Sequence, residues 1–207
     1  MTAPSPPGRL RPDDIAAVLG PTRGATAIDG DATTSDRRRA AVAAVFAPGA
    51  EGTELLFIQR ATVDRDPWSG QMAFPGGRVE AGDADTIATA VRETGEELGL
   101  DIGGALHLGP LADVDGGRGT DRSIVVSAHC FWLDRPQPLH PNYEVAAGLW
   151  LPFDQLLDRR RYIDYLYPPA GARFPGIQLD EPSQVIWGLT LRLLADLMER
   201  LDHPFIV

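Results

Sequence analysis

The chain has 207 residues, the length of one ordinary domain, which is enough for a substantial hydrophobic core. Its formal net charge of −10 argues against binding to nucleic acid or to an anionic membrane through bulk electrostatics. The single cysteine, Cys130, excludes an internal disulfide framework, and no apolar run approaches the length of a membrane span. Because the first residues also lack the pattern of a signal peptide, we expect a cytoplasmic protein.

The sequence is predicted to divide into an N-terminal extension, 1–36, and one globular domain, 37–207. Within the extension, apolar residues recur at helical spacing over 11–19, and Pro12 occupies an early position where its missing N–H costs nothing. We therefore expect a short amphipathic helix that ends before the Gly-Pro pair at 20–21. The rest of the extension is polar and without periodicity, which is typical of a loop.

The globular domain is predicted to begin with a β-hairpin. Two apolar, β-prone runs, 40–47 and 53–61, are separated by the turn-forming residues 48–52. The second run leads through 61–73 into Phe-Pro-Gly-Gly at 74–77, which we call the FPGG segment. Paired glycines let a backbone turn sharply and bring its carbonyl groups close to a ligand.

A helix is predicted over 85–98 from residues that recur at the spacing of one buried face: Ile87, Val91, Thr94 and Leu98. Three acidic residues share a second, narrow face: Glu93, Glu96 and Glu97. Their charges repel each other by a few tenths of a kcal/mol per pair. A divalent cation bound by oxygen ligands, usually Mg²⁺, would reverse that sign. The alternative interpretation is a solvated acidic helix face without chemistry.

Two neighbours of the acidic face favour the metal site over the solvated face. Arg92 lies beside Glu93 and can hold a carboxylate through its fork of donors. Gly95 is unusual in a helix interior, where it costs about 1 kcal/mol relative to Ala. Together with the FPGG segment before the helix, these residues indicate a functional site rather than a solvated helix face.

The stretch from Gly77 to Leu100 resembles the Nudix box, the signature of hydrolases that cleave a nucleoside diphosphate linked to another moiety. The matching residues lie in its second half: Arg92, Glu93, Glu96, Glu97, Gly99 and Leu100. The first half departs from the family pattern, because Asp83 stands where the family has Glu and lies one residue further from the arginine. In the family this acid orients the arginine, so the resemblance assigns that role to Asp83 or Asp85.

The segment 60–77 resembles the motif that coenzyme A diphosphatases of the Nudix family carry just upstream of the box. Arg60, Arg65 and Gly70 correspond, together with the FPGG segment, while one serine of the motif is replaced and one residue is inserted. The resemblance implies coenzyme A as substrate, with Arg60, Arg65 and Gly77 binding it. Surface salt bridges of the two arginines with neighbouring aspartates are the alternative.

Strands are predicted behind the box over 105–114 and 123–133. Side-chain alternation sends His129 and Cys130 to opposite faces of the second strand, so we expect no catalytic pair and interpret Cys130 as a core residue. A loop at 138–144 then leads into another strand. The end of this loop reads Asn-x-Glu-Val and is similar to the segment that brings one further Glu over the metal site in many Nudix enzymes. Glu144 is therefore a candidate ligand or base, with an exposed loop carboxylate as the alternative.

The C-terminal part is predicted to hold a strand over 145–152, a short helix near 154–157 and a late hairpin formed by 162–167 and 174–179. A final amphipathic helix is predicted over 183–201, with an inward face made of these residues: Val185, Ile186, Leu189, Leu193, Leu197 and Leu201. The stretch 186–190 also occurs in the coenzyme A–type relatives.

The resemblance implies the Nudix fold, an α/β architecture with a mixed β-sheet sandwiched between helices (α/β/α). We expect Mg²⁺ or Mn²⁺ to be held by three glutamates and one carbonyl: Glu93, Glu96, Glu97 and Gly76. Water deprotonated by Glu93 or Glu144 then attacks one phosphorus in line and releases two monophosphates. With coenzyme A, the products are 3′,5′-ADP and 4′-phosphopantetheine.

Other functions stay open at this point. The box does not separate coenzyme A from ADP-ribose, a dinucleoside polyphosphate or an oxidised nucleotide, because specificity lies in the loops. A non-catalytic nucleotide-binding Nudix module is disfavoured by the retained glutamates, and a prenyl diphosphate isomerase by the absence of a suitable cysteine–glutamate pairing. The expected partner is a small-molecule diphosphate rather than nucleic acid or a membrane, and a homodimer is left open.

Overall fold

The computed structural model describes residues 8–19, 38–63, 69–116, 124–167 and 171–205, and all statements below concern these residues. The helices are α1 (Pro12–Leu19), α2 (Thr86–Leu98), α3 (Phe153–Leu157) and α4 (Gly188–Arg200), with a 3-10 turn η1 at Arg159–Arg161. The strands are β1 (Arg38–Pro48), β2 (Thr53–Arg60), β3 (Met72–Ala73), β4 (Gly76–Arg78), β5 (Leu106–Pro110), β6 (Val114–Asp115), β7 (Ile124–Trp132), β8 (Val145–Pro152), β9 (Tyr162–Tyr167), β10 (Ala172–Gln178) and β11 (Val185–Trp187).

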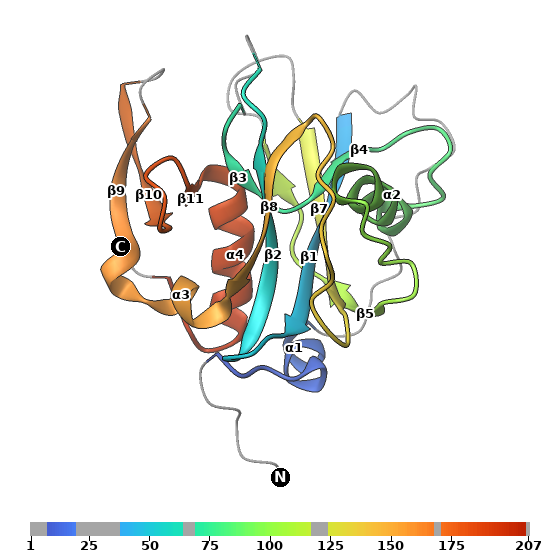
Figure 1. Ribbon diagram of the computed structural model, residues 1–207, viewed down its shortest axis with the longest axis horizontal. Helices are drawn as coiled ribbons and strands as arrows, with labels where there is room; N and C mark the ends of the chain where they lie inside the picture. The colour runs from blue at the N-terminus through green and yellow to red at the C-terminus, as the bar shows by residue number, and fades with distance from the viewer. Residues whose placement is uncertain (1–7, 20–37, 64–68, 117–123, 168–170, 206–207) are drawn as a thin grey trace.

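A mixed sheet forms the centre of the molecule, with strand order β3-β2-β1-β7-β5 (Figure 1). The long strands β1 and β7 are parallel, and every other pairing is antiparallel: β1 with β2 and β4, β2 with β3 and β8, and β7 with β5 and β6. The predicted hairpin is confirmed, since Phe46 pairs with Leu55 across β1 and β2. A second sheet, β11-β10-β9, contains the predicted late hairpin.

Two apolar clusters lie on the two faces of the central sheet. Along β1, Ala43 and Val45 belong to the cluster under α2, while Ala44 and Phe46 belong to the cluster under α4. Figure 1 shows α2 and α4 on opposite sides of the central strands. The expected α/β/α arrangement, a mixed sheet between helices, is therefore confirmed.

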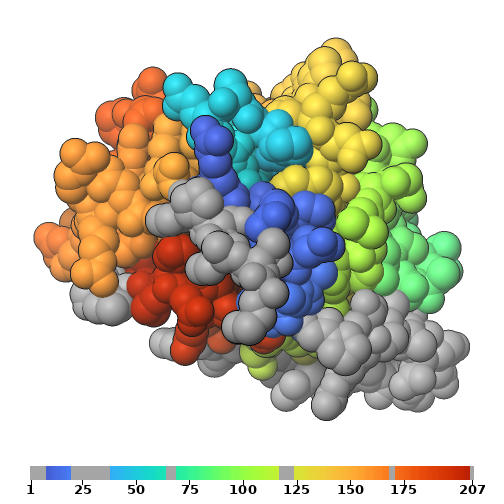
Figure 2. All heavy atoms as spheres, turned by 90° about the horizontal axis from the view of Figure 1, so that it is seen from below, coloured from blue at the N-terminus to red at the C-terminus, as the bar shows by residue number. Residues whose placement is uncertain are grey.

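Helix α1 packs on the same core as α4. Ile15 and Leu19 are buried in the cluster that contains the α4 residues. Figure 2, which views the molecule from below, shows α1, in blue, beside β5. The division of the chain at 36/37 stays a prediction. In the described ranges, no helix is long and apolar enough to cross a membrane.

Both ends of α2 are fixed by local sequence. Asp85 is the N-cap, and its carboxylate accepts the N–H of Ala88 at 2.8 Å. Gly99 ends the helix in the left-handed conformation, with φ of 61°, which glycine adopts without strain. The predicted inward face is confirmed, since Thr94 and Leu98 are buried and Ile87 and Val91, although only partly buried, pack against the same apolar cluster as Leu98. The helix also buries Thr86 and Thr89, which the sequence pattern did not predict.

The predicted final helix over 183–201 starts too early. Val185 and Ile186 are buried in β11, where they pair with β10, and the helix begins at Gly188. The chain turns there with φ of +62° at Gly188, which separates the strand from the helix. Periodicity alone could not find this boundary, because buried apolar residues occur on both sides of it.

Replacing Gly188 by Ala tests the turn between β11 and α4. A Cβ there meets no atom within 4 Å, but the positive φ costs an L-residue about 1–2 kcal/mol, so we expect unfolding free energy to fall by that amount. Gly95→Ala is the matched control, because Gly95 has ordinary helical backbone and its Cβ would lie 4.0 Å from the Leu100 carbonyl oxygen. This control should gain about 0.5–1 kcal/mol. Urea unfolding measures the change in unfolding free energy for both variants. Equal changes in Gly188→Ala and Gly95→Ala would contradict the role of the turn.

Candidate functional site

A bidentate ion pair between Arg92 and Asp83 organises the acidic face of α2. Arg92 Nε donates to Asp83 Oδ1 at 2.9 Å, and Arg92 Nη2 donates to Asp83 Oδ2 at 3.0 Å. Asp83 also accepts the hydroxyl of Thr89, and these hydrogen bonds, led by those from Arg92, lower its pKa to about 2. The structure thus separates the two acids left open by the sequence: Asp83 orients Arg92, and Asp85 caps α2.

The remaining donors of Arg92 reach two glutamates and a strand. Nη1 donates to Glu93 Oε1 at 3.0 Å and to Glu96 Oε2 at 3.1 Å, while Nη2 also donates to the Arg78 carbonyl at 3.0 Å. One guanidinium therefore joins the loop before α2, the helix itself and β4. Glu93 is mostly buried, whereas Glu96 is exposed.

Glu97 is buried between α2 and β4, with 2% of its surface exposed. Its Oε2 accepts the N–H of Gly76 at 2.8 Å. Burial raises the pKa of Glu97 to about 7, against the opposing effects of the Gly76 hydrogen bond and the positive charge of Arg60. The negative charges of Glu93 and Glu144 raise it further. The pKa of Glu93 is likewise raised, mainly by burial.

Two glycines allow β4 to approach both β1 and the acidic helix. Gly76 has φ of 151°, and a Cβ there would lie 2.3 Å from the Ala41 carbonyl oxygen. At Gly77, a Cβ would lie 2.4 Å from Glu93 Oε1. A side chain at Gly76 would push β4 away from the backbone of β1, whereas a side chain at Gly77 would displace the Glu93 carboxylate.

The oxygen donors of this region fit a hard divalent cation. Carboxylates and backbone carbonyls are the ligands that Mg²⁺ and Mn²⁺ prefer. Burial, with a smaller contribution from neighbouring negative charge, raises the pKa of Glu93 and of Glu97, and a bound cation would stabilise their charged forms. Within the described ranges, no group of three His, Cys, Asp or Glu side chains is already gathered closely enough to hold an ion. Arg92 engages Glu93 and Glu96, while Glu97 is turned to Gly76.

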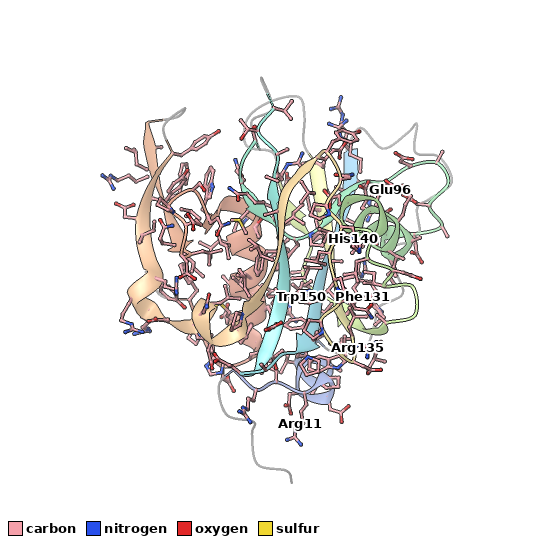
Figure 3. The ribbon with its side chains drawn as sticks, viewed as in Figure 1. Arg11, Glu96, Phe131, Arg135, His140 and Trp150 are labelled. Carbon is pink, nitrogen blue, oxygen red and sulfur yellow. The ribbon has the colours of Figure 1, made fainter. Side chains whose placement is uncertain are left out.

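Glu144 is exposed on a loop that is bonded to the end of α2. His140 N–H donates to the Leu98 carbonyl at 2.7 Å, and Asn142 N–H donates to the Glu97 carbonyl at 2.9 Å. Figure 3 shows His140 on the same side of the sheet as Glu96 of α2. This attachment was not predicted from the sequence, although an Asn two residues before Glu144 is a recognisable turn signal.

The predicted substrate-binding residues are only partly described. Arg60 lies at the end of β2 opposite Val145 of β8, and its charge acts on Glu97. Gly77 lies in β4 against Glu93. Arg65 lies outside the described residues, so its predicted contact with phosphate stays a prediction.

His129 and Cys130 face opposite sides of β7, as expected. Cys130 is fully buried in the cluster under α4, and burial raises the pKa of its thiol. His129 is 2% exposed, its Nε2 lies 2.9 Å from Thr86 Oγ1, and burial lowers its pKa to about 4. Both residues contribute to packing, which confirms Cys130 as a core residue.

Comparison with known proteins gives one family and one fold. The family model described as NUDIX domain matches residues 36–168. Uncharacterized Nudix hydrolase NudL of Yersinia pestis is 30% identical over 170 residues, covering 82% of this chain and 82% of the relative. NudL of Yersinia enterocolitica is 30% identical over 135 residues, covering 65% of this chain and 67% of the relative.

Among solved structures, the NUDIX domain of Shewanella oneidensis NrtR complexed with ADP ribose is similar, with a TM-score of 0.55. The match covers 80% of this chain and 88% of that chain at 17% sequence identity. A likeness at this identity shows the shared fold and nothing about the ligand.

Alanine at the two aspartates should give different defects. Asp83→Ala removes the partner of Arg92, so we expect activity to fall at least tenfold as Glu93 and Glu96 lose their fixed position. Asp85→Ala removes only the cap of α2, so it should cost about 1 kcal/mol of unfolding free energy with activity within about threefold. The measurements are the steady-state rate of diphosphate hydrolysis and the free energy of urea unfolding for both variants. Equal loss of activity would contradict the assignment of Asp83.

Glu97→Gln should change the pH dependence of stability in metal-free protein. Because the folded pKa of Glu97, about 7, lies above its ordinary value of 4.5, this group stabilises the fold at low pH. That contribution is lost as pH rises through about 7. We therefore expect the stability of wild type to fall by on the order of 2 kcal/mol between pH 5 and pH 7.5, and that of Glu97→Gln, which cannot ionise at this position, to lack this fall. Urea unfolding in EDTA measures this, and parallel curves for the two proteins would refute it.

Proposed function

The chain belongs to the Nudix hydrolase family, and from this premise we propose that it hydrolyses a nucleoside diphosphate linked to another moiety with Mg²⁺ or Mn²⁺ as cofactor. The observation that carries the proposal is the arrangement around Arg92, which contacts Asp83, Glu93 and Glu96 beside the buried Glu97. A concentration of buried and paired carboxylates is costly to fold, which favours a catalytic use for it.

We assign the metal to oxygen ligands from α2 and β4: Glu93, Glu96, Glu97 and the carbonyl of Gly76. When bound, a divalent cation would neutralise charge on the diphosphate and lower the pKa of water. Arg92 supports this set by restraining Glu93 and Glu96, and Asp83 restrains Arg92 in turn. In this assignment Arg92 acts on ligand position rather than on the substrate.

Glu144 is the better candidate than Glu93 for the general base. Glu93 is mostly buried and engaged by Arg92, which leaves it suited to hold a cation. Glu144 is exposed, its loop is bonded to the Glu97 carbonyl through the Asn142 N–H, and its charge contributes to the raised pKa of both Glu93 and Glu97. In this role Glu144 takes the proton from water as the water attacks phosphorus.

Coenzyme A or one of its derivatives is our proposed substrate. The segment from Arg60 through the FPGG segment resembles the coenzyme A diphosphatase motif, and Arg60 lies near enough to Glu97 to lower its pKa. A diphosphate with an additional 3′-phosphate needs local positive charge in a chain whose net charge is −10. Arg60, with Arg65 and the Gly77 backbone, is proposed to supply it, and cleavage would give 3′,5′-ADP and 4′-phosphopantetheine.

Other diphosphates are the second candidate class. ADP-ribose, dinucleoside polyphosphates and oxidised nucleotides share the cleaved bond, and the names of the relatives specify no substrate. The cytoplasmic location, the homodimer and the division into an extension at 1–36 and a hydrolase domain at 37–207 also stay predictions.

A panel of candidate diphosphates with Mg²⁺ tests the substrate, with the nucleotide products separated and measured by chromatography. It compares coenzyme A, dephospho-coenzyme A, ADP-ribose, a dinucleoside tetraphosphate and oxidised dGTP, each with wild type and Glu97→Gln. We expect the highest kcat/KM with coenzyme A and a loss of at least 100-fold in Glu97→Gln, since a buried ligand oxygen is replaced. Glu80→Gln is the matched control, because Glu80 is an exposed acid just before α2.

The panel separates the alternatives by their own signatures. Turnover of ADP-ribose or a dinucleoside polyphosphate without turnover of coenzyme A would replace the proposed substrate and keep the hydrolase. Tight binding of one compound, with equal and negligible rates for wild type and Glu97→Gln, would favour a nucleotide-binding module instead.

A further inference from the structure

Asn142 connects the backbone of Glu97 to the backbone of Glu144. Its N–H donates to the Glu97 carbonyl at 2.9 Å, and its side-chain Oδ1 accepts the N–H of Glu144 at 2.8 Å. Its own carbonyl accepts the N–H of Val145 at 3.3 Å. One residue thus bonds both to the helix that carries the proposed ligands and to the proposed base.

The bond to Glu97 closes the C-terminal end of α2. The last carbonyls of a helix have no partner inside the helix and must be satisfied from outside. Asn142 serves the Glu97 carbonyl, and the His140 N–H serves that of Leu98. Because these bonds use main-chain atoms on both sides, they hold the loop against α2 whichever side chains it carries.

The bond to Glu144 depends on the Asn142 side chain. An asparagine that accepts the N–H two residues further along forms an Asx turn, which fixes the backbone between the two residues. Glu144 is exposed, so packing restrains its position little, and without the turn the loop gains conformational freedom. The Glu144 carbonyl is held on its other side by the Ala61 N–H at 2.8 Å, at the end of β2.

We propose that Asn142 is a positioning residue, which sets the place of the Glu144 carboxylate relative to the α2 glutamates through its Asx turn. This inference rests on the proposed function, in which Glu144 is the general base. Asn142 acts through Glu144 and is assigned no contact with substrate or metal. Misplacing a catalytic group by about 1 Å costs on the order of 100-fold in rate, so even partial loosening of the turn should be measurable.

The test is a double-mutant cycle between Asn142→Ala and Glu144→Gln, measured as kcat and KM at saturating Mg²⁺ with the substrate selected by the panel. We expect Asn142→Ala to lower kcat about tenfold with KM within twofold. In the Glu144→Gln background, the same change should alter kcat less than twofold, because the group it positions is already disabled. Asn142→Asp and Asn142→Ser keep an acceptor for the turn, and at least one should recover most of the rate.

Asp101→Ala is the matched control. Asp101 forms an equivalent turn close to the end of α2, where its Oδ1 accepts the Gly103 N–H at 2.8 Å, but it has no bond to Glu144. This variant should keep kcat within twofold, and thermal unfolding should show similar, small shifts for Asp101→Ala and Asn142→Ala. The control thus separates positioning from loop stability.

The outcomes distinguish failure of the inference from failure of the proposed function. Wild-type rates in Glu144→Gln would remove Glu144 as base and overturn the inference with it. A slow Glu144→Gln with an unaffected Asn142→Ala would overturn the inference alone. If Asn142→Ala lowered kcat equally in the wild-type and Glu144→Gln backgrounds, Asn142 would act independently of Glu144, and the inference would be overturned. If the Ala, Asp and Ser variants of Asn142 lost kcat equally, Asn142 would act independently of the turn, and the inference would be overturned as well.

Discussion

The contact between the Glu97 carboxylate and the Gly76 amide fixes the helix of the site on the sheet. A buried carboxylate is expensive unless hydrogen bonds or opposite charge compensate it, and here one N–H and the charge of Arg60 do so only in part. The remaining cost appears as a pKa of about 7. The fold is therefore built around a group that prefers a proton or a cation, and α2 and β4 carry the glycines and donors that make this burial feasible.

Arg92 provides the second constraint, because its positive charge offsets the mutual repulsion of the carboxylates on α2. Its guanidinium is shared among Asp83, Glu93 and Glu96, so the pairing neutralises only part of the local negative charge. The bidentate bond goes to Asp83, which lies before the helix, while single bonds go to the two glutamates. This leaves Glu93 and Glu96 oriented but less tightly bound, an arrangement suited to residues that exchange an arginine contact for a ligand.

Most of the fold followed from local patterns. The hairpin of β1 and β2, the acidic helix and the late hairpin have strong periodicity and clear turn residues, so their positions were predicted within a few residues. Strand β4 was missed because two glycines and an arginine carry no β-pattern; the pairing with β1 makes it a strand. Strand β11 was merged into α4 because Val185 and Ile186 continue an apolar run that only the sheet contact with β10 identifies as a strand.

The candidate site shows the same division between local and tertiary information. The glutamates, Arg92 and the glycines were identified from the box, since their spacing on one helix is a property of the chain alone. The choice between Asp83 and Asp85 depends on the folded loop, because both acids lie near the helix start in sequence and only their positions in space show that Asp85 caps the helix and Asp83 pairs with Arg92. The burial of Glu97 also depends on β4, which the sequence does not place.

The connections of α2 at both ends have a consequence for specificity. Its start is tied through Asp83 and Arg92 to β4, and its end is tied through His140 and Asn142 to the loop of Glu144. The proposed ligands and base therefore share one framework that needs no contribution from the substrate. A framework of this kind is compatible with many diphosphates, so we expect discrimination to come from the segments around it, among them the one that starts with Arg60 at the end of β2. The same catalytic group can then serve different substrates when only those segments change.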